Sequence, residues 1–386
     1  MQKYTTESGG GAWKKPAETA VLNKYQGEFF VQQKIIALAV AAAVSAPAFA
    51  DTTVYGLANV SFDNVHTSSV AAPAINASGG NGVVSNASRL GFKGTEELGN
   101  GLSALYQIET LVTMGDSNAS LFAGARNSNV GLKGGFGTVF LGSWDTPFKV
   151  THNKVELFDN ATFASATDIT GRTATATGST AKAKSFVTRQ SNSIQYWSPD
   201  FNGFQAKLAY GTDTNLSAAT DNSVLSLSAV YENALFYAAY GHESKNDASF
   251  DGQTDRADRL VGAYKFDGGQ VGLAYERLTV GTSATTNASR NGWELSGKYN
   301  MDASSNIGAF YTRAGDIGTT ASSGAKQVAL RYGYKLSRRT ELYGMYSRLS
   351  NDANAKYTFA AGGTPLAASN AGAALSGLGA GMIHTF

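Results

Sequence analysis

The last twelve residues of the chain most constrain its fold, because they alternate in polarity and end on an aromatic residue. The run LSGLGAGMIHTF places Leu378, Ala380, Met382, His384 and Phe386 on one face of an extended strand. A strand with one lipid-facing side is typical of the β-barrels that cross bacterial outer membranes. The alternative is an ordinary edge strand at the end of a soluble β protein. We expect Phe386 to take part in membrane assembly.

The segment 31–50 has the pattern of a secretory signal peptide. Lys34 precedes an apolar run of about a dozen residues, which ends in the cleavage motif Ala48-Phe49-Ala50 and is too short to span a bilayer. We expect cleavage to leave a mature domain at 51–386. Residues 1–30 are polar and mixed in charge, so we expect them to be a spurious extension, with translation starting at Val31.

Charge and composition exclude several classes of function. The first 50 residues hold five of the 31 basic and three of the 29 acidic side chains, which leaves 26 of each in 51–386. A net charge of zero argues against a nucleic-acid partner. Cysteine is absent, which excludes disulfides and thiolate-bound metals. The prolines of 51–386 fall only in expected loops or turns, since proline lacks the N–H that a central strand needs.

Alternating runs of about ten residues, separated by turn residues, recur along the mature domain. They predict sixteen strands, at 52–64, 84–96, 101–113, 124–134, 137–145, 186–198, 203–212, 223–232, 235–244, 258–267, 269–279, 291–301, 305–315, 325–336, 340–350 and 375–386.

One face of these strands is apolar and the other carries charges. In 291–301, Trp293 and Leu295 alternate with Glu294 and Lys298. A soluble sandwich would show the same alternation, but a signal peptide, an even strand count and a terminal Phe386 favour a membrane barrel with a wet lumen. The predicted fold is all-β, a sixteen-stranded antiparallel transmembrane β-barrel.

Short and long connections alternate along the chain, as periplasmic turns and external loops do in such barrels. The longest connection covers residues 146–185 and contains a low-complexity stretch at 173–184. A structureless connection of this length inside one domain requires a functional explanation.

Six motifs resemble those of the general-diffusion porins of Gram-negative bacteria, most closely the β-proteobacterial type. In chain order they are SRLGFKGTEELGNGL (88–102), NVGLKGGFGT (129–138), LGSWDTP (141–147), RQSNSIQYWSPDFNGF (189–204), KLSRRTELY (335–343) and HTF (384–386). The resemblance implies a homotrimer of sixteen-stranded barrels, whose third external loop folds inward and narrows the lumen. The 146–185 connection has the corresponding place and length.

The resemblance also implies basic residues on the wall that face acidic residues of the inward loop. It carries the wall positions onto Arg89, Arg126 and Arg189, and the alternation also directs Lys93 and Lys207 into the lumen. We expect these five side chains to line the lumen. The acidic residues available at the loop are Asp145, Glu156, Asp159 and Asp168. With three wall arginines against these scattered acids, we expect a mild preference for anions.

These features predict a passive channel for ions and small hydrophilic solutes in the outer membrane, in contact with lipid, lipopolysaccharide and the barrel-assembly machinery. No cofactor, metal or enzyme activity is expected, because the four histidines, at 66, 152, 242 and 384, form no paired or metal-binding pattern. The alternatives are a substrate-specific channel, with an aromatic track from Trp144, Phe148, Phe158 and Phe163, and an adhesin-like barrel.

Overall fold

The computed structural model describes residues 52–68, 78–115, 120–158, 161–213, 221–359 and 370–386. Nearly all regular structure in these ranges is β. The strands, in chain order, are β1 (Thr53–Thr67), β2 (Ser78–Ser85), β3 (Arg89–Gly99), β4 (Leu102–Val112), β5 (Phe122–Ala125), β6 (Ser128–Gly134), β7 (Gly137–Asp145), β8 (Arg189–Trp197), β9 (Phe204–Gly211), β10 (Val224–Glu232), β11 (Phe236–Asn246), β12 (Thr254–Phe266), β13 (Gly269–Gly281), β14 (Asn287–Asn300), β15 (Ser305–Ala314), β16 (Ala325–Lys335), β17 (Thr340–Asn351) and β18 (Ala374–Thr385).

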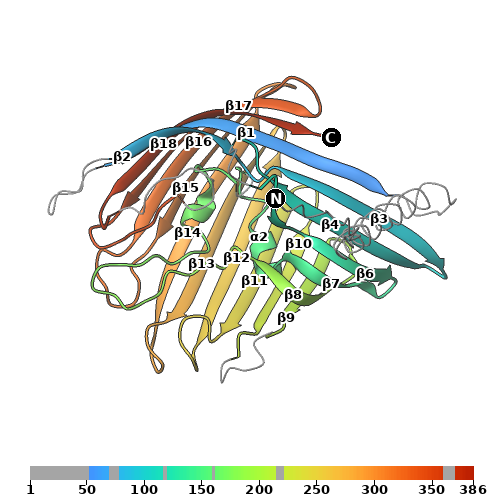
Figure 1. Ribbon diagram of the computed structural model, residues 1–386, viewed down its shortest axis with the longest axis horizontal. Helices are drawn as coiled ribbons and strands as arrows, with labels where there is room; N and C mark the ends of the chain where they lie inside the picture. The colour runs from blue at the N-terminus through green and yellow to red at the C-terminus, as the bar shows by residue number, and fades with distance from the viewer. Residues whose placement is uncertain (1–51, 69–77, 116–119, 159–160, 214–220, 360–369) are drawn as a thin grey trace, which may run out of the picture. The chain divides into compact units, whose positions relative to one another are not determined.

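Two of these eighteen segments continue a neighbouring segment, so the barrel has sixteen spanning strands. β2 and β3 both pair with β1, on either side of a break at Asn86–Ser88. β5 and β6 likewise both pair with β4, on either side of Arg126 and Asn127. Each strand pairs antiparallel with the next, as the side-by-side arrows of Figure 1 show. The predicted sixteen-stranded antiparallel fold is therefore confirmed.

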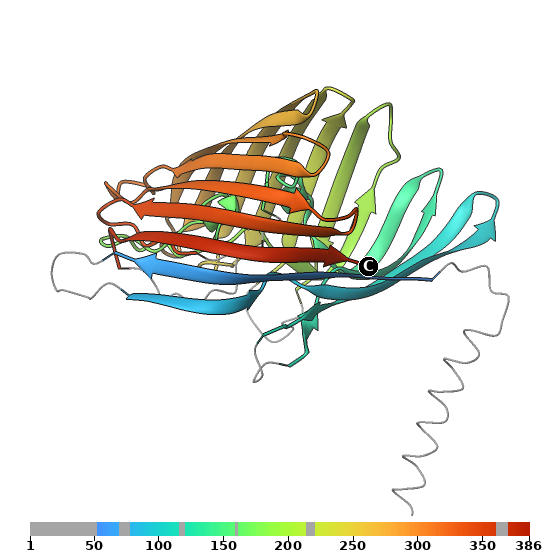
Figure 2. The same ribbon diagram turned by 90° about the horizontal axis from the view of Figure 1, so that it is seen from above.

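The first and last strands close the sheet. β1 and β18 pair in register from Leu57↔Thr385 to Thr67↔Leu375, and they lie side by side in Figure 2. Beyond them, the backbones of Gly56 and Phe386 exchange two hydrogen bonds, of 3.0 and 3.2 Å. Closure satisfies the backbone groups that a sheet edge would leave unpaired in lipid.

The two faces of the sheet differ as the alternation predicts. On β13, the outward side chains of Leu273 and Tyr275 are about half exposed, whereas the inward Gln270 and Glu276 are buried. Most exposed large apolar side chains of the other strands share this outward side. The inward side chains are buried because other parts of the chain cover them inside the barrel. The connection 146–188 provides much of this cover.

Several strands extend further toward the long loops than predicted. β12 begins at Thr254 instead of 258, β14 at Asn287 instead of 291, and the strand containing β3 reaches back to Ser78. The added residues are mostly polar or glycine. Hairpins that continue beyond the apolar band are not required to alternate in polarity, so the alternation could not mark their ends.

The only regular helices in the described ranges lie in the connection between β7 and β8. They are the α-helix α2 (Pro147–Thr151) and the 3₁₀ helix η1 (Ala166–Asp168). Each begins with a side-chain cap, from Thr146 and Ser165 respectively, as expected for these residue types. No helix among the described residues is long and apolar enough to cross a membrane.

Candidate functional site

The connection between β7 and β8 packs its aromatic side chains against the inner side of the sheet. Phe148, Phe158 and Phe163 are fully or almost fully buried. The Phe158 ring meets Phe310 of β15 edge to face, with centroids 5.4 Å apart. Phe163 lies so close to β18 that a Cβ on Gly377 would overlap its ring, so glycine is required there. These three rings therefore anchor the connection.

Buried charges fasten the same connection to β12–β14. Glu276 accepts hydrogen bonds from the Gly171 backbone N–H, at 2.8 and 3.0 Å, and forms ion pairs with Arg259 at 2.7 Å and Arg290 at 2.9 Å. Arg290 also donates to the Ile169 carbonyl at 2.8 Å. All three charged side chains are buried, where an unpaired charge would be costly. We call Glu276, Arg259 and Arg290 the latch.

A second buried contact holds the connection to β14. Nε2 of His152 lies 2.7 Å from Oε2 of Glu294, and the Thr170 hydroxyl donates to the same oxygen at 3.0 Å. Both His152 and Glu294 are almost fully buried. Contacts of Phe148 with Ser226 of β10 and of Thr151 with Tyr237 of β11 extend this side, so the connection is held against β10–β18 and faces the wall formed by β3–β8.

Arg89, Arg126 and Arg189 meet at one cavity of about 320 Å³ between this wall and the connection. All three lie where a strand begins or breaks. Arg89 follows Ala87, whose φ of 53° marks the break between β2 and β3; Arg126 lies in the break between β5 and β6; Arg189 begins β8. Such irregularities redirect side chains beside functional sites. Here they bring three guanidinium groups together.

The same cavity, which we call the charged cavity, contains one further cation and three carboxyl groups. Glu109 of β4 pairs with Arg126 at 2.7 Å and lies 3.7 Å from Arg89. Asp145, at the end of β7, pairs with Lys149 at 2.7 Å and with Arg189 at 3.4 Å.

Glu156 is the third carboxyl group of the charged cavity and the one that the loop itself contributes. It accepts hydrogen bonds from the Phe158 backbone N–H at 2.8 Å and from the Ser165 hydroxyl at 3.1 Å. Burial raises its pKa to about 7, against the opposing effect of His152. Burial also lowers the pKa of Lys149, which Asp145 partly offsets. With four cations against three carboxyl groups, the cavity has a positive excess that grows as Glu156 is protonated.

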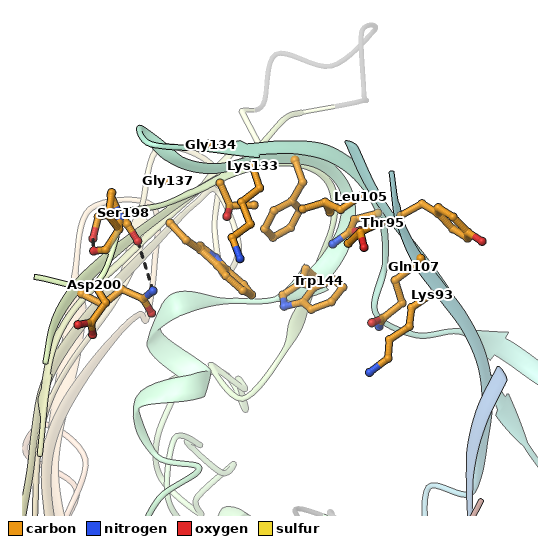
Figure 3. Close-up of a pocket in the computed structure, with 18 of the residues that line it drawn as sticks. Lys93, Thr95, Leu105, Gln107, Lys133, Gly134, Gly137, Trp144, Ser198 and Asp200 are labelled. Carbon is orange, nitrogen blue, oxygen red and sulfur yellow. Dashed lines mark hydrogen bonds between the residues drawn. The ribbon is translucent and has the colours of Figure 1, made fainter. Parts of the chain in front are cut away.

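A second cavity, of about 790 Å³, lies nearer the short turns and is drawn in Figure 3. We call it the aromatic cavity, because Phe140, Trp144 and Trp197 line it. Lys93 and Lys133 also line it, and their amino groups extend into the same space as Trp144. Lys207 lies over the Trp197 ring, 4.2 Å from its centroid. Lys93 thus lies at this cavity and Lys207 beside one of its rings.

The predicted acidic residues separate in space. Asp145 and Glu156 line the charged cavity. Asp168 lies instead on the far side of the connection, where it accepts a hydrogen bond from Gln327 of β16 at 3.0 Å. Asp159 lies outside the described residues. Since irregular backbone has no periodicity, the sequence could place these acids in the loop but not at points of the cavity.

Several residues of the two cavities were not identified from the sequence, among them Glu109, Lys133, Lys149 and Asn127. Glu109 lies on the inward face of β4 two residues from Gln107, so the alternation of the 101–113 run could have identified it. Lys133 is likewise on the inward face of β6. Lys149 lies in the short helix α2, and Asn127, which donates to Asp145 at 3.2 Å, lies in the break between β5 and β6, so neither had such a signal.

A closed barrel of sixteen strands, apolar outside and charged inside, defines an outer-membrane channel. A family model described as Gram-negative porin matches residues 37–354. The outer membrane porin protein 32 of Delftia acidovorans is 30% identical over 376 residues, which cover 92% of this chain and 100% of that protein. The major outer membrane protein P.IB of Neisseria gonorrhoeae is 28% identical over 64% of this chain and 71% of its own.

Solved structures agree. The anion-selective porin from Comamonas acidovorans matches with a TM-score of 0.74 and 25% identity, over 87% of this chain and 100% of that one. A loop-deletion form of OmpT from Vibrio cholerae, at 15% identity and a TM-score of 0.63, shares the fold over 87% of this chain and 99% of that one. The chain belongs to the Gram-negative porin family. It is an outer-membrane porin whose water-filled lumen serves passive diffusion.

Proposed function

We propose that the charged cavity is the constriction of this channel and gives it a mild preference for anions. The observation that carries this proposal is the meeting of Arg89, Arg126 and Arg189 around one cavity. Arginine stays ionised at any relevant pH, so three of the four positive charges of this cavity are permanent. The similarity to the anion-selective porin from Comamonas acidovorans supports a selectivity for anions over cations. Solutes that pass would be ions and small hydrophilic molecules.

In this proposal the connection between β7 and β8 is the constriction loop. Its latch to β12–β14 and its buried rings keep it from moving into or out of the lumen. The opening that remains lies between loop residues such as Glu156 and the arginines of the wall. Fixed charges at a narrow point act strongly on ions, because few water molecules screen them there.

Replacement of all three arginines by glutamine tests the proposal. The carboxylates of Glu109 and Asp145 would then dominate the cavity beside Lys149, so the preference should shift toward cations. The zero-current potential in a KCl gradient measures this shift. If the potential of the triple variant equals that of the original protein, the charged cavity does not determine the ion selectivity.

A substrate-specific channel remains the second candidate, and an adhesin-like barrel the third. The loop aromatics that suggested a track, Phe148, Phe158 and Phe163, are buried against the sheet and unavailable to a solute. Only Trp144 faces a cavity. Liposome swelling with sugars and amino acids of increasing size separates the candidates, because general diffusion gives a smooth dependence on size.

For assembly, we propose a homotrimer in contact with lipid and lipopolysaccharide. The outward sides of β1 and β16–β18 form an apolar hollow of about 500 Å³, lined by Phe62, Leu330, Tyr346 and Leu378, where another subunit or lipid would pack. One of the similar solved structures, of OmpT, is described as a trimer form. Native electrophoresis before and after heating would reveal a trimer as a single threefold change in mass.

For export, we propose that translation starts at Val31, that 31–50 directs secretion and that cleavage follows Ala50. These residues lie outside those that the structure describes. The terminal strand with Phe386 would then engage the barrel-assembly machinery. N-terminal sequencing of the protein from outer membranes tests the cleavage point, and the codon at Val31 tests the start.

A further inference from the structure

The aromatic cavity has a composition that simple diffusion does not require. The inside of a porin-type barrel is expected to be polar, because it contains water. Here Phe140, Trp144 and Trp197 gather on the inner side of β7 and β8, next to two inward lysines. We propose that this cavity is a binding subsite for small aromatic carboxylates. The proposal rests on the proposed channel function only in that the solute must enter the lumen.

The three rings form a cluster with edge-to-face geometry. The Phe140 centroid lies 5.4 Å from Trp144 and 5.1 Å from Trp197, and the two indoles are 5.9 Å apart, with interplanar angles between 62° and 88°. Phe140 is buried beneath, whereas both indoles are partly exposed. Aromatic rings prefer this arrangement, so a further flat ring can join the cluster at the exposed indoles.

Among the described residues, no carboxylate forms an ion pair with the lysines beside the cluster. In the part of the chain that the structure describes, Lys93, Lys133 and Lys207 form no ion pair with a carboxylate. Lys93 lies over the Tyr55 ring at 5.1 Å and Lys207 over Trp197. Each of the four cations in the charged cavity, by contrast, lies near Glu109 or Asp145. An ammonium group without a counter-ion is an available partner for a carboxylate.

Together these features select one chemical class. An aromatic carboxylate offers a flat ring to Trp144 and a charge to Lys133 or Lys93, which Figure 3 shows extending into the same space. An aliphatic anion would form ion pairs with the lysines but no ring contact with the indoles. A neutral sugar would form no ion pair with the lysines. The volume of about 790 Å³ falls within the range of small-molecule sites.

Residues that line the aromatic cavity are neighbours of residues that line the charged cavity. Trp144 precedes Asp145, and Gln107 of the aromatic cavity donates a hydrogen bond to the Asn127 carbonyl of the charged cavity at 2.8 Å. Arg89 and Lys93 share the inward face of β3, four residues apart. An anion that leaves the arginines therefore meets the lysines next.

The experiment compares three probes of equal charge on the full-length protein in planar bilayers. Benzoate should reduce the chloride current at concentrations where acetate and cyclohexanecarboxylate, which has no aromatic ring, have little effect. Replacement of Trp144 by leucine should raise the concentration needed for half-block about fivefold, the scale of an aromatic pair. Lys133→Gln should do the same. Trp144→Phe, which keeps a ring, should retain most of the block.

Lys298→Gln is the matched control, because Lys298 has inward parity on β14, near a short turn but away from the aromatic cluster. It should leave the block by benzoate unchanged. Quenching of tryptophan fluorescence by benzoate gives an independent readout, with Trp293→Phe removing the outward indole of β14.

Different results would contradict the subsite and the channel function. Normal conductance without selective block by benzoate, or equal block in Trp144→Leu, would overturn the subsite and leave the channel. Benzoate-dependent quenching in a protein that does not conduct would overturn the channel and leave the subsite.

Discussion

Nε of Arg126 lies 2.7 Å from Oε1 of Glu109, although the two residues come from the break between β5 and β6 and from the neighbouring strand β4. Glu109 also accepts a hydrogen bond from the Tyr55 hydroxyl at 3.0 Å and lies 3.7 Å from Arg89. A wall carboxylate therefore holds two of the three wall arginines, and the loop is not the only source of negative charge in the charged cavity.

Replacing Glu109 by glutamine should increase the preference for anions. The substitution removes one negative charge and leaves Arg89 and Arg126 facing the lumen. A unit charge about 10 Å from the ion path contributes roughly 0.4 kcal/mol in water, with opposite signs for an anion and a cation, so the anion-to-cation permeability ratio should rise about fourfold. The zero-current potential in a KCl gradient measures it. An unchanged ratio in a variant of normal conductance would contradict the role of this cavity.

Selectivity should depend on pH through Glu156. Its pKa is raised to about 7 by burial, so the carboxyl group is neutral below this value and negative above it. The preference for anions should therefore fall as the pH rises from about 6 to 8. In Glu156→Gln this dependence should disappear, whereas in Glu109→Gln it should persist. The zero-current potential across this pH range is the measurement.

The same shift predicts a direction for stability. Between the unfolded pKa of about 4.5 and the folded pKa of about 7, the folded protein keeps a proton that the unfolded chain releases. The contribution of Glu156 to the free energy of unfolding should decrease as the pH rises through this window and stay constant above it. Denaturation of Glu156→Gln and the original protein at pH 5 and 8 isolates this contribution.

Loss of the latch should loosen the constriction loop. Glu276→Gln leaves Arg259 and Arg290 buried without their carboxylate, and breaking a buried pair of this kind costs about 3–5 kcal/mol. We expect noisier and larger single-channel currents. Glu341→Gln is the control, because Glu341 pairs with Arg331 at 3.0 Å without contact to the loop. Equal current noise in both variants would contradict the latch.

A methyl group on β18 should displace the loop in a similar way. In Gly377→Ala the new Cβ would overlap the Phe163 ring, and overpacking of this kind costs about 1–3 kcal/mol. Gly344 of β17 is the matched control, since nothing lies within 4 Å of a Cβ there. The temperature at which the folded form disappears on electrophoresis should fall for Gly377→Ala alone.

The sixteen strands could be predicted because lipid on one side and water on the other impose alternation on every spanning segment. The same alternation predicted that Lys93 and Lys207 point inward. It would have predicted the same direction for Glu109 and Lys133. It gave no information on the loop, where contacts such as Gly171 with Glu276 join residues more than 100 positions apart. Asp168 illustrates the consequence, because a 3₁₀ turn directs it toward Gln327 and away from the charged cavity.

The role of the charged cavity as the constriction is tested by the zero-current potential of single channels of the original protein under a KCl gradient at pH 6, where Glu156 is largely protonated. The positive excess around Arg89, Arg126 and Arg189 predicts well-defined conductance steps and a modest potential of the anion-selective sign. A potential of the cation-selective sign in a folded, conducting barrel would contradict the assignment of the charged cavity as the constriction.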